Sequence, residues 1–523
     1  MKKFLIINFV IIFLFFVCAE LVARIFTVPA SFDFIERRIM EEGLSIKKEP
    51  GEYRILLFGE STMHGNHLFP KSTIRIWMQL YLENLLGKEK AKHIKIINLG
   101  RLGAGSDFIK QSYLDTLPYK PDLVIFYTAH NDFIQLENRQ LILKKVKTNP
   151  IGDFFQSMFK KSYFISAMKR MGIKAKLKRT LAKEAKCDKT NDWYNEKKTK
   201  VYHKDTDLLK PNGPDFQRIQ SHWENNIKEI INVAAQHHIQ VMFLEGIAKY
   251  REYEPFESVH NHKLSSPQML EWKQAFEMAE TQLKNGQYVE AADSYQKAMA
   301  IDPQYALTYF RLGECYEKLE DYQKANEFYI ASNERDYFPV RAPQTANQFY
   351  EKIASSHLPN VNVIKTQELF ENNSDHEIVD DSLILDQIHP TMKGQALIAL
   401  NIVRLLYAQG KFAPKIEWHW DSLKTMDELK QELKLDNNFE FLFYIYSANY
   451  VGSYHNKAVE YLNEALARKP NAIAAKSHLA WIYWTTGEEA KAITIYKELY
   501  QQDSKKAEKF FKRHPEIAQK VNP

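Results

Sequence analysis

The stretch YRILLFGES, residues 53–61, decides the fold. Its first six residues are a mostly apolar run of strand length, which ends abruptly in Gly59-Glu60-Ser61. A short apolar run with little alternation is typical of a strand in a parallel sheet that helices cover on both faces. We therefore expect Ser61 at the carboxyl end of a buried strand, the edge at which open α/β sheets place their sites.

Two more strands of the same kind end in residues suited to a site. The run at 94–97 leads into the glycine-rich segment 98–106, and the run at 122–127 leads into Thr128-Ala-His-Asn-Asp132. Glycines just past a strand let the backbone approach a ligand closely. With a predicted helix at 74–86 between the first two strands, three strand ends are expected to meet at one edge.

Asp386-Gln-Ile-His389, far downstream, supplies what a reactive serine needs. A serine hydroxyl is a poor nucleophile unless a base takes its proton and a third group holds that base. Among the 17 histidines, only His389 has an aspartate three residues before it, a spacing that lets one turn present both side chains. Taken alone, a serine after glycine is ordinary turn chemistry, so the hypothesis depends on the segments in between.

With these segments the chain resembles the SGNH hydrolase superfamily, also called the GDSL esterases and lipases. Its four blocks match Gly59-Glu60-Ser61, Gly103 within 98–106, Asn131 within 129–132, and 386–389. The resemblance implies an α/β fold, a three-layer, flavodoxin-like parallel sheet flanked by helices, and it implies no cofactor and no metal.

The resemblance also assigns roles to five residues. Ser61 would be the nucleophile, His389 the base and Asp386 the residue that orients the base. The oxyanion hole would comprise the backbone N–H groups of Ser61 and Gly103 and the side-chain amide of Asn131. Such donors are each worth about 3 to 4 kcal/mol of transition-state stabilisation.

Two positions depart from the family pattern. Glu60 stands where the family more often has Asp, and Ala129 stands where the third block usually has Gly. Neither position has a proton-transfer or oxyanion role in the family, so the chemistry is expected to survive. The departures leave the subfamily, and with it the substrate, open.

Other polar residues nearby are interpreted more plainly. His64 and His67 have helical ligand spacing, but no third ligand is paired with them in the sequence, and metal sites need three or four. We interpret them as loop histidines and His130 as a residue that lines the pocket. Asp132 is expected either to cap the next helix or to touch substrate.

The N-terminus predicts export. Lys2-Lys3 precede an uncharged stretch, residues 4–19, and apolar residues resume after Glu20 as far as Val28. Residues 1–28 can span the roughly 30 Å hydrocarbon core of a bilayer as one transmembrane helix, with Glu20 and Arg24 at the interface. Cleavage of a signal peptide after Ala19 is the alternative. We favour an uncleaved signal anchor because the apolar residues resume.

We therefore expect the catalytic domain in the periplasm of a bacterium, tethered to the inner membrane by a single transmembrane helix. The remaining features of the sequence fit this location. The chain has three cysteines, Cys18, Cys187 and Cys315, so the exported part can form at most one internal disulfide. Basic residues on both sides of the apolar segment blunt the positive-inside asymmetry. The net charge of +6 over 523 residues gives no reason to expect nucleic-acid binding, which needs a concentrated basic face.

One segment, between Arg139 and Lys210, is locally basic and interleaves aromatic residues at helical spacing in its first part. It could form an amphipathic cover that leans on the anionic membrane surface. We favour the alternative, a solvated helical insertion whose apolar stripe packs on the hydrolase.

Two blocks of the chain resemble tetratricopeptide repeats (TPR). From 275 to 332 two units repeat with a period of about 34 residues, with small residues such as Ala291 and Gly313 among aromatics such as Tyr295 and Tyr329. A more degenerate pair follows near the C-terminus, beside the aromatic helix expected at 441–450. Two repeats are too few to be stable alone, so each pair must pack on something else; a protein partner is one candidate.

The predicted organisation has six parts, with a hydrolase domain that insertions interrupt. They are the signal anchor (1–28), a linker (29–50), the first part of the hydrolase (51–265), an inserted repeat pair (266–335), the second part of the hydrolase (336–410) and a helical repeat-like region (411–523). Strands are expected at 240–244 and 361–364, and a closing helix at 393–407.

The sequence thus predicts a membrane-anchored serine esterase that acts on acylated envelope carbohydrate or lipid. Two rival hypotheses stay open. An O-acyltransferase would use the same residues to pass the acyl group to a sugar hydroxyl, and a non-catalytic scaffold would use the repeats to hold a partner. The four blocks speak against the scaffold, which has no physical need to place Ser, Asn, Asp and His together.

Overall fold

The computed structural model describes residues 33–68, 70–143, 208–451 and 455–521. These residues form two compact units, one that extends to Ser422 and one from Leu423 onward, to which residues 67–71 are also assigned. The predicted signal anchor, 1–28, and positions 144–207 of the basic segment lie outside the described residues. No helix in the described ranges is long and apolar enough to cross a membrane.

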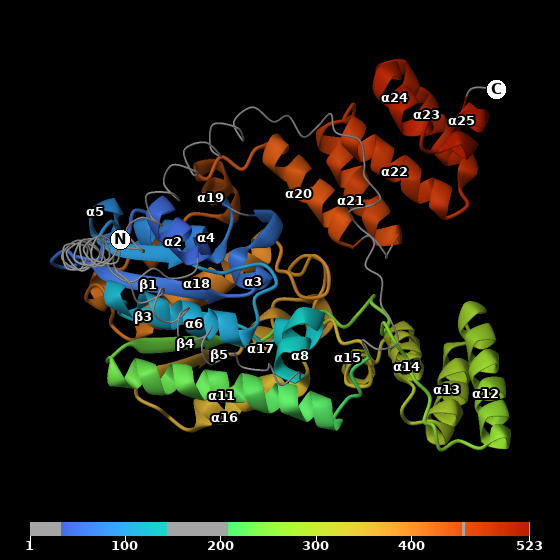
Figure 1. The fold of residues 1–523 in the computed structure, drawn as a ribbon, viewed down its shortest axis with the longest axis horizontal. Helices are drawn as coiled ribbons and strands as arrows, with labels where there is room; N and C mark the ends of the chain where they lie inside the picture. The colour runs from blue at the N-terminus through green and yellow to red at the C-terminus, as the bar shows by residue number, and fades with distance from the viewer. Residues whose placement is uncertain (1–32, 69, 144–207, 452–454, 522–523) are drawn as a thin grey trace, which may run out of the picture. The chain divides into compact units, whose positions relative to one another are not determined.

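In the described part of the first unit, five parallel strands form one sheet in the order β2-β1-β3-β4-β5 (Figure 1). The strands are β1 (Tyr53–Gly59), β2 (Ile94–Asn98), β3 (Leu123–Tyr127), β4 (Gln240–Leu244) and β5 (Val361–Ile364). This is the flavodoxin-like order, in which the crevice for a ligand opens between β1 and β3. All five predicted strands are present, each within one residue of its expected bounds.

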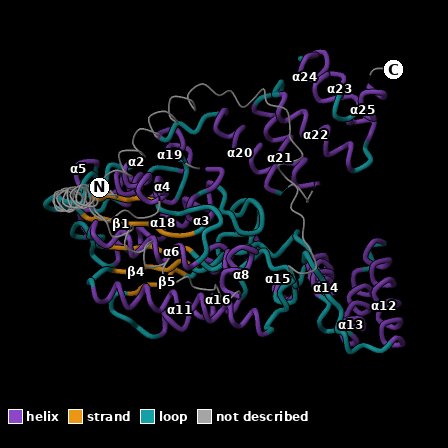
Figure 2. The backbone as a smooth tube through the Cα atoms, in the orientation of Figure 1, coloured by secondary structure: helices purple, strands orange, loops and turns teal. Residues whose placement is uncertain are grey.

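Helices cover the sheet on both sides, as the apolar strands require (Figures 1 and 2). Leu56, Phe58 and Phe126 point into a core shared with α6, α11 and α16, and α18 packs on α4. The helices of this layer structure are α2 (Asp33–Glu41), α3 (Ser61–His64), α4 (Ile74–Leu86), α5 (Lys88–Ala91), α6 (Ser106–Thr116), α7 (Asn131–Ile134), α8 (Leu136–Leu143), α11 (Pro214–Gln236), α16 (Gln344–Ser355), α17 (Thr366–Glu371) and α18 (Met392–Ala408).

Aromatic packing holds the α11 and α16 side of the sheet together. The Trp223 ring lies 5.4 Å from Phe349 and 5.3 Å from Tyr350, and Phe126 stacks on Phe58 at 5.3 Å. Such pairs contribute about 0.5 to 1.5 kcal/mol each beyond the burial of their area.

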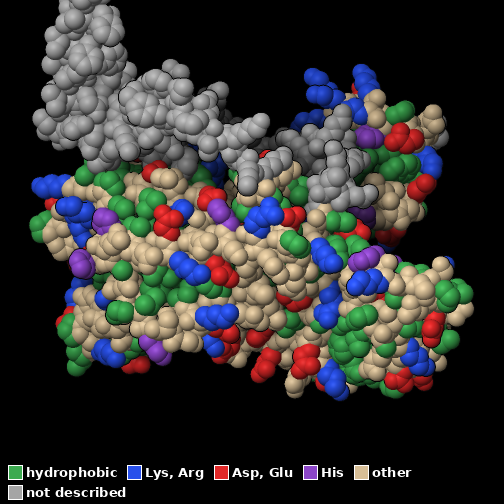
Figure 3. Space-filling view, turned by 60° about the horizontal axis from the view of Figure 1, so that its bottom comes forward, with side chains coloured by type: hydrophobic (Ala, Val, Ile, Leu, Met, Phe, Trp, Pro, Cys, Tyr) green, Lys and Arg blue, Asp and Glu red, His purple; other side chains and the backbone are tan. Residues whose placement is uncertain are grey.

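On the face of the molecule drawn in Figure 3, basic and acidic side chains are interspersed over the first unit.

The inserted repeats form two helical hairpins, as predicted. Their helices are α12 (Ser266–Lys284), α13 (Tyr288–Ile301), α14 (Ala306–Lys318) and α15 (Tyr322–Asn333). A Cβ atom on Gly313 would lie 2.6 Å from ring atoms of Tyr329, so only glycine allows α14 and α15 to approach this closely. Small residues facing aromatics therefore have the packing role that the sequence pattern indicates.

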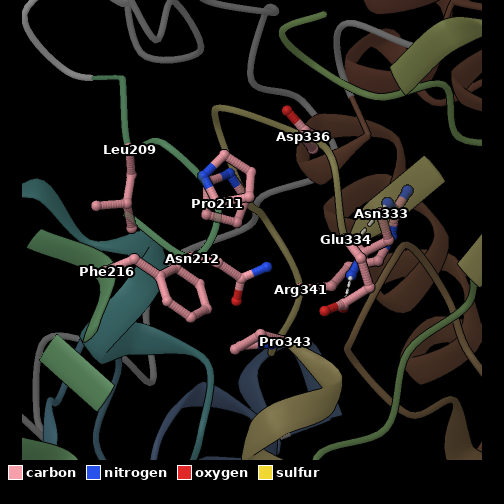
Figure 4. A pocket seen from close by; sticks show the side chains of 10 residues that line it. Leu209, Pro211, Asn212, Phe216, Asn333, Glu334, Asp336, Arg341 and Pro343 are labelled. Atoms are coloured by element: carbon pink, nitrogen blue, oxygen red, sulfur yellow. Dashed lines mark hydrogen bonds between the residues drawn. The ribbon is translucent and has the colours of Figure 1, made fainter. Parts of the chain in front are cut away.

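The root of the insertion is tied to the hydrolase by buried charges. Arg341, 2% exposed, donates to the carbonyl oxygens of Lys249 and Tyr253 and to Oδ1 of Asn333, at 3.0 to 3.1 Å. Figure 4 shows the side chains of Arg341 and Asn333 beside each other. It thereby joins the outgoing chain, residues 249–253, to the end of α15. The first repeat pair thus packs on the hydrolase, which fits the expectation that two repeats need a neighbour.

The second unit is helical throughout its described length. Its helices are α19 (Met426–Glu432), α20 (Asn437–Tyr450), α21 (His455–Arg468), α22 (Ile473–Thr485), α23 (Glu489–Gln502), α24 (Ser504–Phe511) and α25 (Pro515–Val521). The predicted boundary at 411 lies before this unit. His419 N–H donates to Leu85 O at 3.0 Å and the Trp418 ring lies 5.5 Å from Tyr407, so residues 411–422 pack on the hydrolase.

Candidate active site

Ser61 is the first residue of α3, directly after β1 turns at Gly59 and Glu60. A Cβ atom on Gly59 would lie 2.4 Å from the carbonyl oxygen of Tyr127 and 2.6 Å from Cβ of Met63, so this turn requires glycine. The close approach of β1, β3 and α3 leaves the Ser61 side chain 6% exposed at the carboxyl edge of the sheet. The predicted location of Ser61 at a strand end is confirmed.

The structure brings Ser61, His389 and Asp386 into one hydrogen-bonded chain. Nε2 of His389 lies 2.7 Å from Oγ of Ser61, and Nδ1 of His389 lies 2.7 Å from Oδ2 of Asp386. All three residues are buried or nearly so, at 4 to 7% exposed. This is the geometry in which an imidazole can take the serine proton while a carboxylate holds the ring.

The environment of Asp386 keeps its carboxylate charged. Its Oδ1 accepts the backbone N–H groups of Ile388 and His389, both at 2.8 Å. Burial alone would raise the pKa of Asp386, but the charge of His389 and these hydrogen bonds hold it well below its ordinary value. A carboxylate that stays ionised at neutral pH can stabilise the imidazolium that forms when His389 takes a proton.

One side chain of α18 fixes the α3 turn against α4. The Oε1 atom of Gln395 accepts the N–H of Ile74 at 2.9 Å, and its Nε2 donates to the carbonyl oxygen of Thr62 at 3.2 Å. Gln395 is 1% exposed and lies six residues after His389 in the chain. The helix that follows the catalytic loop therefore also holds the residue next to Ser61.

The predicted oxyanion donors lie on neighbouring segments. Asn131 Nδ2 donates to the carbonyl oxygen of Ala104 at 3.1 Å, and Asn138 Nδ2 donates to the carbonyl oxygens of Gly103 and Asn131 at 3.3 and 3.0 Å. Gly103 has a φ of +70°, which favours glycine. Among the described residues, the backbone N–H groups of Ser61 and Gly103 have no acceptor. The Asn131 amide carries a second N–H, and the oxyanion role of these three donors stays a prediction.

Two buried carboxyl groups join the blocks, and sequence reasoning missed the role of the first. Glu60, fully buried, accepts hydrogen bonds from Thr128 Oγ1 and from the backbone N–H groups of residues 129–131, all at 3.1 Å. Burial and the charge of Asp132 raise the pKa of Glu60 to about 8 against these hydrogen bonds. A charged residue placed directly between a buried strand and the nucleophile was the signal in the sequence.

Asp132 links the third block to the second. Its carboxyl oxygens accept the backbone N–H of Ser106 at 2.9 Å and the Ser106 hydroxyl at 2.7 Å. Ser106 begins α6, so Asp132 caps the start of that helix from another element. Of the two roles expected for Asp132, the cap is made to α6 and not to the helix next to it in sequence, and contact with substrate stays a prediction.

His130 is fully buried and joins the third block to the chain that returns from the repeats. Its Nδ1 accepts the backbone N–H of Ala342 at 3.0 Å, so its ring proton is on Nε2. Burial lowers the pKa of His130 to about 3, which keeps the ring neutral. That His130 lines a pocket stays a prediction.

The outgoing chain to the repeats also borders the site. The backbone N–H of Lys249 donates to the carbonyl oxygen of Gln387 at 2.9 Å, within the loop between Asp386 and His389. The buried ammonium group of Lys249 pairs with Asp381 and Glu252. In the described residues, no group of three or more His, Cys, Asp or Glu side chains is placed to hold a metal ion.

Comparison with known protein families identifies the repeats. Models of the tetratricopeptide repeat match residues 282–338 and 455–507. The chain carries tetratricopeptide repeats. A search of curated proteins finds no match.

Solved structures similar to the chain include GDSL-type enzymes. A protein named as an acylhydrolase from Bacteroides fragilis is 11% identical, with 73% of this chain and 99% of that chain covered and a TM-score of 0.32. A GDSL-like lipase from Bacteroides thetaiotaomicron is 10% identical (72% and 100% covered, TM-score 0.31). A catalytic mutant of an acetylxylan esterase from Geobacillus stearothermophilus is 11% identical (68% and 95%, TM-score 0.30). At these values the likenesses do not define the activity of this chain.

Proposed function

We propose that the chain is a serine esterase that hydrolyses carboxylic esters through an acyl-enzyme on Ser61. The observation that carries the proposal is the hydrogen-bonded chain from Ser61 Oγ through His389 to Asp386, with both distances at 2.7 Å. Each of the three residues has a different role in acyl transfer: Ser61 is the nucleophile, His389 the base and Asp386 the carboxylate that orients the base. A protein that only held partners would have no physical need for this buried constellation.

The reaction follows from the positions of the atoms. Oγ of Ser61 attacks the ester carbonyl carbon while Nε2 of His389 takes the hydroxyl proton, and the imidazolium is stabilised by Asp386. His389 then gives the proton to the oxygen of the leaving alcohol, and the C–O bond of the ester breaks. In the second half His389 deprotonates a water molecule, which attacks the acyl carbon. The bond from this carbon to Oγ of Ser61 then breaks, His389 returns the proton to Oγ, and the acid is released.

In each tetrahedral intermediate the negative charge lies on the former carbonyl oxygen, and three donors would stabilise it. They are the backbone N–H groups of Ser61 and Gly103 and the second N–H of the Asn131 amide, each of which lacks an acceptor among the described residues. Donors that are fixed before the reaction cost no reorganisation when the charge develops. Gly103 and Asn131 are therefore assigned to binding the oxyanion.

The location and the substrate are proposed from the sequence alone. Residues 1–28 would anchor the enzyme in the bacterial inner membrane as a single pass, with the catalytic domain in the periplasm. Acyl groups on envelope carbohydrate or lipid are then within reach, and the repeats are free to bind a protein partner.

Hydrolysis of p-nitrophenyl esters of increasing chain length tests the activity. We expect Ser61→Ala to lower kcat by at least about 1,000-fold without changing the thermal midpoint of unfolding. Ser112→Ala, which removes a buried hydroxyl on α6 bonded to Phe108 O, is the matched control and should keep the wild-type rate. Wild-type activity in the Ser61 variant would overturn the proposal, and faster acyl transfer to an added sugar than to water would identify an acyltransferase.

A further inference from the structure

Glu60 connects the nucleophile to the third block through a single side chain. It precedes Ser61 in the chain, and its carboxyl group accepts four hydrogen bonds from the segment that ends β3 and begins α7. Three of the donors are consecutive backbone N–H groups, of Ala129, His130 and Asn131. Glu60 is fully buried, so its carboxyl group is shielded from bulk solvent.

The loop that Glu60 holds leads into a short helix whose first N–H groups need acceptors from outside the helix. The helix α7 has only four residues, Asn131–Ile134, so its first N–H groups lack intrahelical acceptors. Leaving a buried N–H without an acceptor costs about 1 to 3 kcal/mol. A carboxyl group from the neighbouring strand end supplies the acceptors for all three N–H groups at once.

We propose that Glu60 is a positioning residue that sets the oxyanion hole. By fixing the backbone of residues 129–131 relative to Ser61, it fixes the direction in which the Asn131 amide points. This inference rests on the proposed function, because the Asn131 amide matters only if an oxyanion forms. Asp132 complements it by holding the same loop to Ser106 at the start of α6.

The two oxygens of Glu60 have different hydrogen-bond partners, and the choice of test variant uses this difference. Oε1 accepts from Thr128, Ala129 and His130, whereas Oε2 accepts, within the described part of the chain, only from Asn131 N–H. Glu60→Gln can keep its oxygen on the side of the three donors, but its NH2 group then faces the N–H of Asn131. A carboxyl oxygen can accept this N–H in either protonation state, and an amide nitrogen cannot.

We expect Glu60→Gln to lower kcat for ester hydrolysis by about 30-fold to 100-fold, the size of a weakened oxyanion donor, with KM within about twofold of wild type. Glu245→Gln is the matched control. Glu245 is also buried, at 4% exposed, directly after β4 at the same sheet edge, but its Oε1 has no partner among the described residues. We expect this control to keep the wild-type kcat.

Hydrogen exchange provides a readout that does not depend on activity. In Glu60→Gln the backbone amides of residues 129–131 should exchange faster than in wild type and in Glu245→Gln, while the β1 amides keep their protection. Wild-type kcat in the Glu60 variant would contradict the positioning role. If the wild-type protein hydrolysed no ester, the proposed function would fail, and unchanged exchange at 129–131 would then overturn the inference as well.

Glu60→Asp serves if the glutamine variant does not fold. Its two oxygens are withdrawn by one methylene, so they no longer reach all four donors. We expect a kcat about tenfold below wild type at unchanged KM, and faster exchange at residues 129–131. Wild-type values of both kcat and exchange in this variant would contradict the role of Glu60.

Discussion

The imidazole of His389 lies 2.7 Å from the hydroxyl of Ser61, although 328 positions separate the two residues in the chain. The parallel sheet makes this possible, because Ser61 follows β1 and the loop of His389 follows β5 at the same edge. The repeat insertion accounts for part of the separation: it leaves the sheet after β4 and returns before α16. The two halves of the site are thus parts of one domain.

Ser61 and His389 should act as a unit. We expect Ser61→Ala and His389→Ala each to lower kcat by about 1,000-fold or more, and the double variant to be no slower than the worse single one. The physical reason is that neither group can perform its half of the proton transfer alone. Rates of p-nitrophenyl ester hydrolysis of the three variants measure this. Losses that multiply in the double variant would show that the two residues act independently.

Asp386→Asn should abolish the correct tautomer of His389. The asparagine must turn its oxygen toward the N–H groups of Ile388 and His389, which places its NH2 group against Nδ1. Nδ1 then accepts, the ring proton moves to Nε2, and His389 can no longer take the proton of Ser61. We expect kcat to fall about 10,000-fold. Burst and steady-state kinetics check this, and a loss of less than tenfold would contradict the role of Asp386.

The stability of the protein should fall on the alkaline side because of Glu60. Its folded pKa of about 8 exceeds its ordinary value of 4.5, so the folded state binds the proton more tightly. The stability from protonated Glu60 is full below its ordinary pKa and is lost as pH rises through about 8. Asp132, with its pKa raised to about 6, and the buried Tyr127 and Tyr350 face the same group.

Urea unfolding of wild type and Glu60→Gln from about pH 5 to about pH 8.5 isolates this contribution. We expect the free energy of unfolding of the wild type to decline more steeply with pH than that of the variant, which has no carboxyl group to titrate at position 60. Parallel curves for the two proteins would contradict the raised pKa of Glu60.

Arg341→Met should loosen the root of the inserted repeats. It removes three hydrogen bonds and leaves the buried acceptors on Lys249, Tyr253 and Asn333 unpaired, at a cost of about 3 kcal/mol or more. Arg335→Met is the control, because Arg335 is partly exposed and water can replace its hydrogen bonds to backbone carbonyls. Denaturant unfolding of the two variants measures the difference. Equal stability of the Arg341 and Arg335 variants would contradict the role of Arg341 in holding the insertion to the hydrolase.

The sheet could be predicted because its strands are short, uninterrupted apolar runs. Each predicted run became a strand within a residue of its expected ends, and Ser61 and Asn131 came to the same edge because parallel strands share one direction. The repeats were equally visible, since Gly313 and Tyr329 must face each other for two helices to pack at this distance.

What the sequence did not reveal depends on contacts between distant segments. Glu60 was interpreted as a departure from the family pattern, because its position after a buried strand does not show that residues 129–131 are the partners of its carboxyl group. Asp132 was expected to cap the next helix or to touch substrate, and the structure shows that it reaches back to Ser106. The contacts of residues 411–422 with the hydrolase, such as the packing of Trp418 on Tyr407, likewise join segments that no local pattern connects.

The central claim is that Ser61 is the nucleophile, and covalent labelling tests it most directly. The full chain is treated with a fluorophosphonate, which forms a stable bond to an activated serine, and the adduct is located by mass spectrometry of its peptides. We predict one adduct on Ser61, formed by the wild type and by Ser112→Ala but not by Ser61→Ala or His389→Ala. A wild-type protein that stays unlabelled, or that carries the adduct on another residue, would contradict the account.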